Sequence, residues 1–242
     1  MPWKCVGETW RRGPGAELGE ACGCECQRLV RGAGLAPSDA QAVRGAQSAG
    51  VRVVGYVATG YGKDPIASVR AQIADYYTWY RVDGIFLDET PYACNASLVE
   101  YYRSLRNAIV AHARQSHAHG IVVMNPGTVP AGDCYMSIAD VLVTFEDTEH
   151  VYTATTGNHY SPAAWLSRYP ASRFWHIVYG VPDAAAMLRV LSLAAARGAG
   201  WVYVTDLGLP NPYGALPAYW SQETAAAAKT PLPPPHAHSP AA

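Results

Sequence analysis

The sequence predicts an α/β protein, most simply a (β/α) barrel of the TIM type. Strand-like and helix-like segments alternate along most of the chain, which favours a parallel sheet. The strand-like segments are continuously apolar, as expected of strands covered on both faces. A doubly wound sheet would fit the same alternation, but no G-x-G-x-x-G loop joins an early strand to a helix. A length of 242 residues is also ordinary for one barrel.

Each predicted element has its own local signal. A helix is expected over 38–50, where Ser38 can cap the first turn and Gly50 ends the last. A second helix, over 65–80, begins with proline and carries apolar residues at helical spacing. The strands are short β-branched or aromatic runs. The predicted strands cover residues 51–58, 84–88, 121–125, 141–146, 174–180 and 201–206, and the remaining helices cover 96–115, 161–169 and 183–198.

The two ends of the chain lack this alternation. Residues 1–31 are rich in Gly, Arg and Cys, and we interpret them as an irregular N-terminal segment. Residues 225–242 are rich in proline and are expected to form an extended tail. The barrel domain is therefore predicted over 32–224. Its first strand is expected to be incomplete or atypical: either ECQRLV (25–30) builds this strand, or the start of the chain is divergent or truncated.

Composition excludes several function classes. Net charge is −1, so nothing indicates a nucleic-acid partner, and no apolar run is long enough for a membrane helix. No signal peptide is visible after Met1. Three of the six cysteines form a C-x-C-x-C cluster at 22–26, whose spacing does not fit a usual metal site. We interpret these thiols as incidental, and no metal or other cofactor is expected.

Polar and acidic side chains follow several predicted strands, at the barrel edge where chemistry is usually found. Glycoside hydrolysis needs two carboxyl groups, one of which protonates the leaving oxygen. Asp88 and Glu89 would face opposite sides of a regular strand, but a turn before Thr90 can present both. Glu146, from another strand, is the candidate for the opposing carboxylate. The residues expected to line a substrate cleft are Tyr61, Asn125, His176, Tyr179, Asp206, Asn211 and Tyr213.

Structural roles are open alternatives for several of these residues. Asp206 can cap the following helix, and Asn125 can belong to a simple turn with Pro126 and Gly127. His176 lies inside an apolar run, where a core histidine is the more common finding.

Several segments together resemble a known family. They are GYVATGYGKDPIASVRAQIADYYTWYRVDGIFLDET, MNPGTVP, ADVLVTFE and GAGWVYVTDLGLPNPYGALPAYW. In combination, over roughly 32–222, they resemble the spherulation-specific family 4 proteins, a group that includes glycoside hydrolase family 135. Members of that family normally open with an apolar strand and an Asn-Pro-rich loop. Here GCECQRLVRGAGLAPSD stands in that place.

The resemblance implies a (β/α) barrel that hydrolyses α-1,4-linked polysaccharide containing galactosamine or N-acetylgalactosamine, as in a biofilm or cell wall, with retention suggested. The family's acidic pair matches Asp88 and Glu89, and its third acid matches Glu146. We assign proton donation to Glu89; with an N-acetylated substrate, Asp88 would steer a neighbouring acetamide. An extracellular or cell-surface monomer is implied. The alternative is a non-catalytic carbohydrate-binding or spore-wall protein on the same barrel.

Overall fold

The computed structural model describes residues 5–6, 37–227 and 229. Its seven strands form one sheet in chain order. The strands are β1 (Cys5–Val6), β2 (Arg52–Ala58), β3 (Gly84–Asp88), β4 (Ile121–Met124), β5 (Val141–Thr148), β6 (Phe174–Tyr179) and β7 (Trp201–Val204). The helices are α1 (Pro37–Ser48), α2 (Ile66–Tyr80), α3 (Ala96–Ser116), α4 (Glu149–Thr153), α5 (Ala184–Ala196) and α6 (Trp220–Ala227), with short 3-10 turns η1 (Gly60–Gly62), η2 (Ala164–Arg168) and η3 (Ala171–Arg173).

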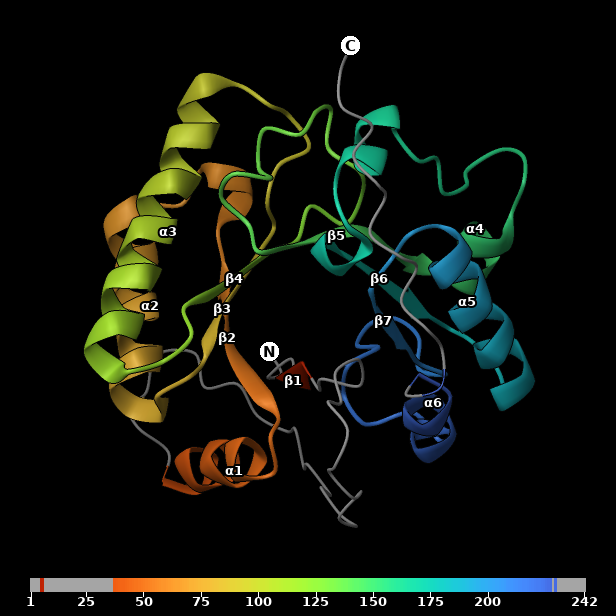
Figure 1. The fold of residues 1–242 in the computed structure, drawn as a ribbon, viewed down its shortest axis with the longest axis horizontal. Coiled ribbons are helices and arrows are strands. Elements are labelled where there is room, and N and C mark those ends of the chain that lie inside the picture. Colours follow the sequence, from red (N-terminus) through yellow and green to blue (C-terminus); the bar gives the residue numbers. More distant parts are fainter. Residues whose placement is uncertain (1–4, 7–36, 228, 230–242) are drawn as a thin grey trace.

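The sheet is a curled half-barrel of six parallel strands, β2 to β7, with β1 antiparallel at one edge. Helices α1 to α3 cover the outside of β2 to β4, and α4 to α6 lie outside β5 to β7 (Figure 1). The prediction of a parallel α/β sheet is confirmed. Within the described residues no pairing joins β7 to the opposite edge, so a complete barrel is not established. The expected first strand at 25–30 lies outside the described residues, as does the C-x-C-x-C cluster.

The predicted strands and long helices are present, with boundaries shifted by a few residues at most. Two short helices were missed. Helix α4 begins directly after β5, where Thr148 accepts a hydrogen bond from the Val151 N–H and caps it. Helix α6 carries few large apolar residues, and it runs to Ala227, three residues past the expected domain end at 224. The segment predicted as a helix over 161–169 forms only the 3-10 turn η2.

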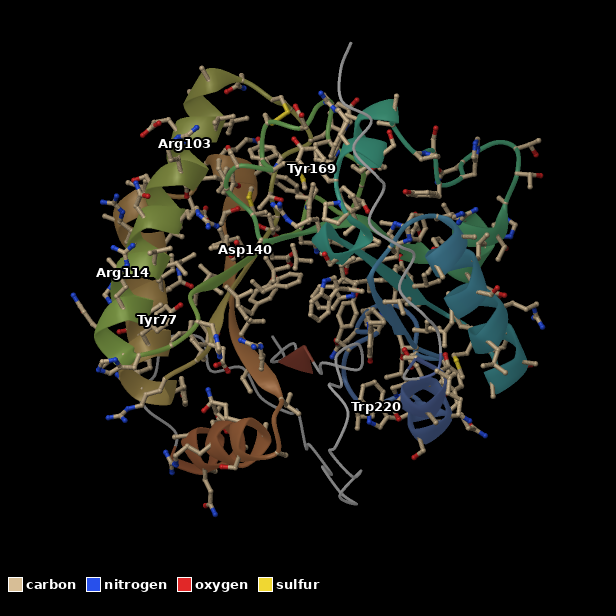
Figure 2. The ribbon with its side chains drawn as sticks, viewed as in Figure 1. Tyr77, Arg103, Arg114, Asp140, Tyr169 and Trp220 are labelled. Atoms are coloured by element: carbon tan, nitrogen blue, oxygen red, sulfur yellow. A yellow bond between two sulfur atoms is a disulfide. The ribbon has the colours of Figure 1, made fainter. Side chains whose placement is uncertain are left out.

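The parallel sheet separates two apolar clusters, and this separation decides which residues can meet a ligand. The larger cluster fills the space between the outer face of the sheet and the helices. The smaller one lies on the inner face and includes Val54, Phe86, Val123, Trp175 and Ile177. Polar side chains dominate the outer side of the helices; Figure 2 shows Arg103 and Arg114 on the exposed side of α3.

The amino edge of the sheet is held by carboxylates with structural roles. Asp83, directly before β3, accepts hydrogen bonds from the Val53 N–H at 2.9 Å and from Gln47 at 3.0 Å. Asp140 accepts the Val122 N–H at 2.8 Å and pairs with Arg106. No helix among the described residues is long and apolar enough to cross a membrane.

Candidate active site

Two of the predicted acids meet at the carboxyl ends of the strands through one amide. The Asn125 Nδ2 donates to Asp88 Oδ1 at 2.7 Å and also donates to Glu146 Oε2. Asp88 is the last residue of β3, Asn125 follows β4, and Glu146 lies on β5. Because both carboxylates bind one nitrogen, their nearest oxygens lie within two hydrogen-bond lengths, about 6 Å. We name this trio the acid cluster.

The orientation of the Asn125 amide is fixed by its own carbonyl. Asn125 Oδ1 accepts a hydrogen bond from the Gly127 N–H at 2.9 Å, so the NH₂ group must face the acids. Gly127 has a φ of +68°, a conformation that favours glycine, and its carbonyl accepts the Glu146 N–H at 2.9 Å. The Asn-Pro-Gly turn, which the sequence left open as a simple turn, therefore connects β4 to Glu146 and aims the amide.

A β-bulge in β5 turns Glu146 toward the inner face. Val143 pairs with Trp175, and the next pair is Phe145 with His176, so Thr144 is the extra residue. Val143 belongs to the inner cluster and Phe145 to the outer one. Without the bulge, strict alternation from Val143 would point Phe145 inward and Glu146 outward. The extra residue reverses that order, and Glu146 joins the acid cluster.

Tyrosine hydroxyls complete the hydrogen bonding of the acids. Tyr56 donates to Asp88 Oδ2 at 2.5 Å, and Tyr213 donates to Glu146 Oε1. Burial, together with the nearby carboxylates, raises the pKa of both phenols well above the ordinary range, so both stay protonated donors. Tyr179 donates to Asp147 at 3.4 Å, and the fields of Asp147 and Glu146 add to burial in raising its pKa. Tyr56 was not among the predicted site residues.

Glu89 is placed beside Asp88 by a turn of the backbone. Strand β3 ends at Asp88, and Glu89 has a φ of +52°, which is uncommon for a residue with a side chain. The Thr59 hydroxyl bonds the carbonyls of both Asp88 and Glu89, and the Tyr61 N–H bonds the Glu89 carbonyl at 2.7 Å. No hydrogen bond to the Glu89 carboxylate is found within the described residues, and its field reaches Tyr56. The adjacent acids thus diverge, with Asp88 in the cluster and Glu89 beside it.

A disulfide joins two loops of this rim. Cys94, after β3, is bonded to Cys134, after β4. The Tyr135 hydroxyl bonds the Ala93 carbonyl at 2.6 Å and strengthens the same junction. This disulfide was not predicted from the sequence, in which the cysteines at 22–26 were the only recognisable cluster. The available signal was that both cysteines follow neighbouring parallel strands, whose ends lie side by side.

Not every predicted site residue reaches the acid cluster. His176 is wrong as a substrate contact: it is 1% exposed on the outer face of β6, where its Nδ1 bonds the Tyr152 hydroxyl at 2.7 Å. Burial lowers its pKa to about 3, so it is a neutral core histidine. The Asp206 carboxylate accepts the Ala218 N–H before α6, which is the capping-type alternative. Asn211 is exposed and bonds the Tyr213 N–H, holding that loop.

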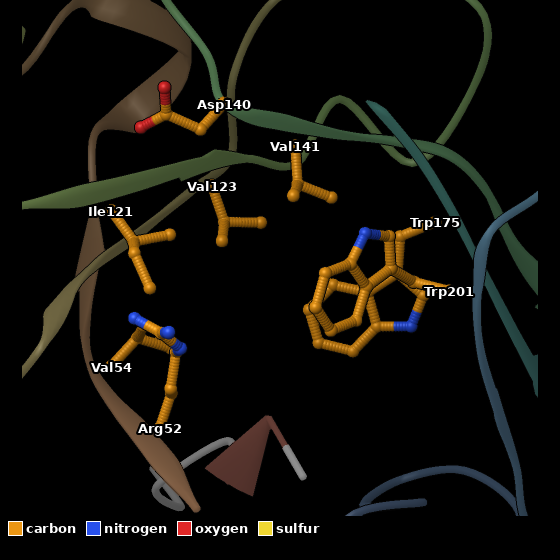
Figure 3. A pocket seen from close by; sticks show the side chains of 8 residues that line it. All are labelled: Arg52, Val54, Ile121, Val123, Asp140, Val141, Trp175 and Trp201. Carbon is orange, nitrogen blue, oxygen red and sulfur yellow. The ribbon is translucent and has the colours of Figure 1, made fainter. Parts of the chain in front are cut away.

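A separate apolar cavity of about 250 Å³ lies at the amino ends of the strands, on the same inner face (Figure 3). It is lined by Arg52, Val54, Ile121, Val123, Asp140, Val141, Trp175 and Trp201. The acid cluster lies at the carboxyl ends of the strands, and this cavity lies at their amino ends, so the cavity is not part of that site. Over the part of the chain that the structure describes, no group of three or more His, Cys, Asp or Glu side chains is arranged to hold a metal ion.

Comparisons with known proteins identify a family and relatives that match most of the chain. The family model described as "Spherulation-specific family 4" matches residues 38–227. Spherulin-4 of Physarum polycephalum is 31% identical over 190 residues, which cover 74% of this chain and 53% of that protein. The chain thus spans about half the length of that curated relative. The crystal structure of Aspergillus clavatus Sph3 in complex with GalNAc is 27% identical, with a TM-score of 0.62 over 73% of this chain and 72% of that one.

Proposed function

Because the chain belongs to spherulation-specific family 4, we propose that it is a glycoside hydrolase acting on α-1,4-linked polysaccharide that contains galactosamine or N-acetylgalactosamine. The observation that carries this proposal is the acid cluster, in which Asn125 binds Asp88 and Glu146 together at the carboxyl ends of parallel strands, with Glu89 alongside. The likeness to Sph3, whose structure contains GalNAc, supports the choice of sugar.

The three carboxyl groups divide naturally by their surroundings. Asp88 and Glu146 each receive hydrogen bonds on both oxygens, which hold these carboxyl groups in place. Glu89 is half-buried, and its carboxyl receives no such hydrogen bond among the described residues, which leaves its oxygens available to the glycosidic oxygen of a substrate. We therefore assign Glu89 as the proton donor to the glycosidic oxygen, and the two clustered carboxylates to the charge that develops at the sugar.

The proposed reaction runs in two steps. Glu89 gives its proton to the leaving oxygen as the anomeric C–O bond breaks, and Glu146 attacks the anomeric carbon from the opposite face. Water then displaces Glu146, with Glu89 taking the water's proton, which retains the configuration. This replaces the expected attack by a neighbouring acetamide. At an α-linkage of this sugar the acetamide lies on the same side as the leaving group and cannot attack from behind. Asp88 then stabilises the positive charge that develops at the anomeric carbon, and the Asn125 amide that it shares with Glu146 holds it in place.

The inner tyrosines supply the rest of the proposed cleft. Tyr56, Tyr179 and Tyr213 lie around the acids with half-buried rings and hydroxyl groups. Rings of this kind give sugars an apolar face and a polar tip. The Cys94–Cys134 disulfide is expected in an oxidising compartment, which supports an extracellular or cell-surface location.

The test compares Glu146→Gln with Glu100→Gln, a surface glutamate on α3 that pairs only with Arg103 among the described residues. Release of reducing ends from α-1,4-linked galactosaminoglycan is measured with full-length protein. We expect cleavage by the parent chain and by Glu100→Gln, and a loss of at least about a hundredfold in Glu146→Gln. Binding of the polymer without cleavage by the parent would instead support a carbohydrate-binding protein. Equal rates for the two variants would refute the assigned site.

A further inference from the structure

Exposed aromatic and aliphatic side chains gather at the carboxyl rim of the sheet. Among the described residues, the large apolar side chains that are most exposed are Tyr61 (55%), Tyr92 (58%), Leu188 (51%) and Leu209 (73%). Tyr61, in η1, follows β2, Tyr92 follows β3 and Leu209 follows β7, so three of these four lie in segments that follow the carboxyl ends of strands, as the residues of the acid cluster do. Leu188 lies on α5. Exposed apolar side chains at a functional edge can belong to a binding surface.

The backbone that carries Tyr92 is firmly anchored on both sides. Before it, the Thr90 N–H bonds the Asn125 carbonyl at 3.0 Å, and Thr90 is buried. The Tyr92 carbonyl itself accepts the Ala131 N–H at 3.0 Å, and two residues later Cys94 is bonded to Cys134. The ring therefore extends into solvent from a fixed loop. Its hydroxyl has no hydrogen-bond partner within the described residues.

Tyr61 is presented in a comparable way on the neighbouring loop. Its backbone has a φ of +58° and its N–H bonds the Glu89 carbonyl. Tyr92 is three residues after Glu89, so its Cα lies within about 11 Å of the Glu89 Cα. Two exposed rings thus stand on anchored segments whose backbones lie close to Glu89. A residue that its surroundings hold in a strained backbone conformation, as Tyr61 is held, is often functional.

We propose that Tyr92 is a stacking platform for a sugar ring beyond the cleaved linkage, and that with Tyr61 it makes the protein a binder of the interior of a polymer chain. This inference rests on the proposed function, and it adds that the protein prefers a long polymer chain to a single sugar. A pyranose presents a face of C–H groups that packs on an aromatic ring, and tyrosine offers a large contact area at low conformational cost. A fixed loop lowers that cost further.

The test measures polymer binding rather than cleavage. In full-length protein that carries Glu146→Gln, the Kd for soluble galactosaminoglycan and for free N-acetylgalactosamine is compared among the parent, Tyr92→Ala and Tyr92→Phe. Leu188→Ala, of similar exposure but on α5, is the matched control. We expect Tyr92→Ala to weaken polymer binding roughly five- to tenfold and to leave monosaccharide binding unchanged. Tyr92→Phe and Leu188→Ala should both match the parent.

Three results would overturn the inference. If Tyr92→Ala binds the polymer as tightly as Leu188→Ala does, Tyr92 is not a stacking platform. If Tyr92→Ala loses polymer binding and monosaccharide binding equally, Tyr92 supports the acid cluster instead. A loss in Tyr92→Phe as large as in Tyr92→Ala would assign the contact to the hydroxyl rather than the ring. Failure of the proposed function is distinguishable, because it appears as absence of cleavage by the protein that carries no substitution, whereas the inference is decided by the comparison of polymer binding among the Tyr92 variants.

Discussion

We expect Glu223 to make the stability of this protein fall as pH rises. The side chain is 3% exposed on α6, and one of its oxygens accepts the Val204 N–H of β7 at 2.8 Å. The other oxygen has no partner among the described residues. Burial raises the pKa of this carboxyl to about 8, although the hydrogen bond from Val204 opposes the shift. At neutral pH the folded protein therefore holds a proton on Glu223 that the unfolded chain releases.

The magnitude follows from the two pKa values. Between the ordinary pKa of 4.5 and the folded value of about 8, the folded state binds more protons than the unfolded state. The free energy of unfolding then decreases with increasing pH, at about 1.4 kcal/mol per unit. The stabilisation is complete below pH 4.5 and lost by about pH 8. The loss is on the order of 3 kcal/mol by pH 7, a large part of the stability of an ordinary domain.

The variant Glu223→Gln isolates this effect. Glutamine keeps an acceptor for the Val204 N–H and mimics the protonated acid, so its unfolding free energy should not carry the slope. Urea unfolding from pH 5 to pH 8 is the assay, with Glu100→Gln as an exposed control on α3. We expect the parent and the control to lose stability over this range, and Glu223→Gln to be the more stable protein at pH 7. Parallel curves for the parent and Glu223→Gln would refute the reasoning.

Three further outcomes are expected. His176→Phe should remove a loss of stability at acid pH. Burial lowers the pKa of His176 to about 3, so below pH 6.5 the unfolded chain binds a proton that the folded protein excludes. Between pH 6.5 and pH 4, the free energy of unfolding should therefore fall with decreasing pH in the parent and not in the variant. Replacing Cys94 and Cys134 by serine opens a 40-residue loop and should cost about 4 kcal/mol in unfolding free energy, while a reductant should destabilise the parent and leave the double variant unchanged. Asn125→Ala should lower kcat/KM for the polymer by a factor of about 10²–10⁴, because two hydrogen bonds to carboxylates are lost; a rate near that of the parent would contradict the role of the acid cluster.

The regular part of the fold was predictable because its signals are local. The β-branched run of β2 and the capped helix α3 reflect propensity and periodicity within a few residues. The rule that parallel strands share one functional edge then pointed to the residues at the ends of β3 and β4, which are Asp88 and Asn125. Closure of the barrel was not predictable in this way, because it depends on pairing between segments far apart in the chain.

The bulge at Thr144 shows why the orientation of Glu146 could not be obtained by counting residues. Alternation along VLVTFE predicts Val143 and Phe145 on one face, and the observed pairing places them on opposite faces. Nothing in the six residues marks the insertion, since a bulge is decided by the register with β6. Glu146 was a candidate because it comes from another strand that ends at the same edge of the sheet, and the resemblance to a family pointed to the same residue. The prediction that His176 contacts substrate was wrong for a related reason. Which face of the sheet this side chain occupies depends on how β6 packs against Tyr152.

The charge balance at the rim bears on what the site can stabilise. The donors described for Asp88 and Glu146 are the neutral side chains of Asn125, Tyr56 and Tyr213. These neutral donors hold the carboxylates in place without cancelling their field. Positive charge that develops at an anomeric carbon, as in glycoside cleavage, would be stabilised by these preorganised negative groups.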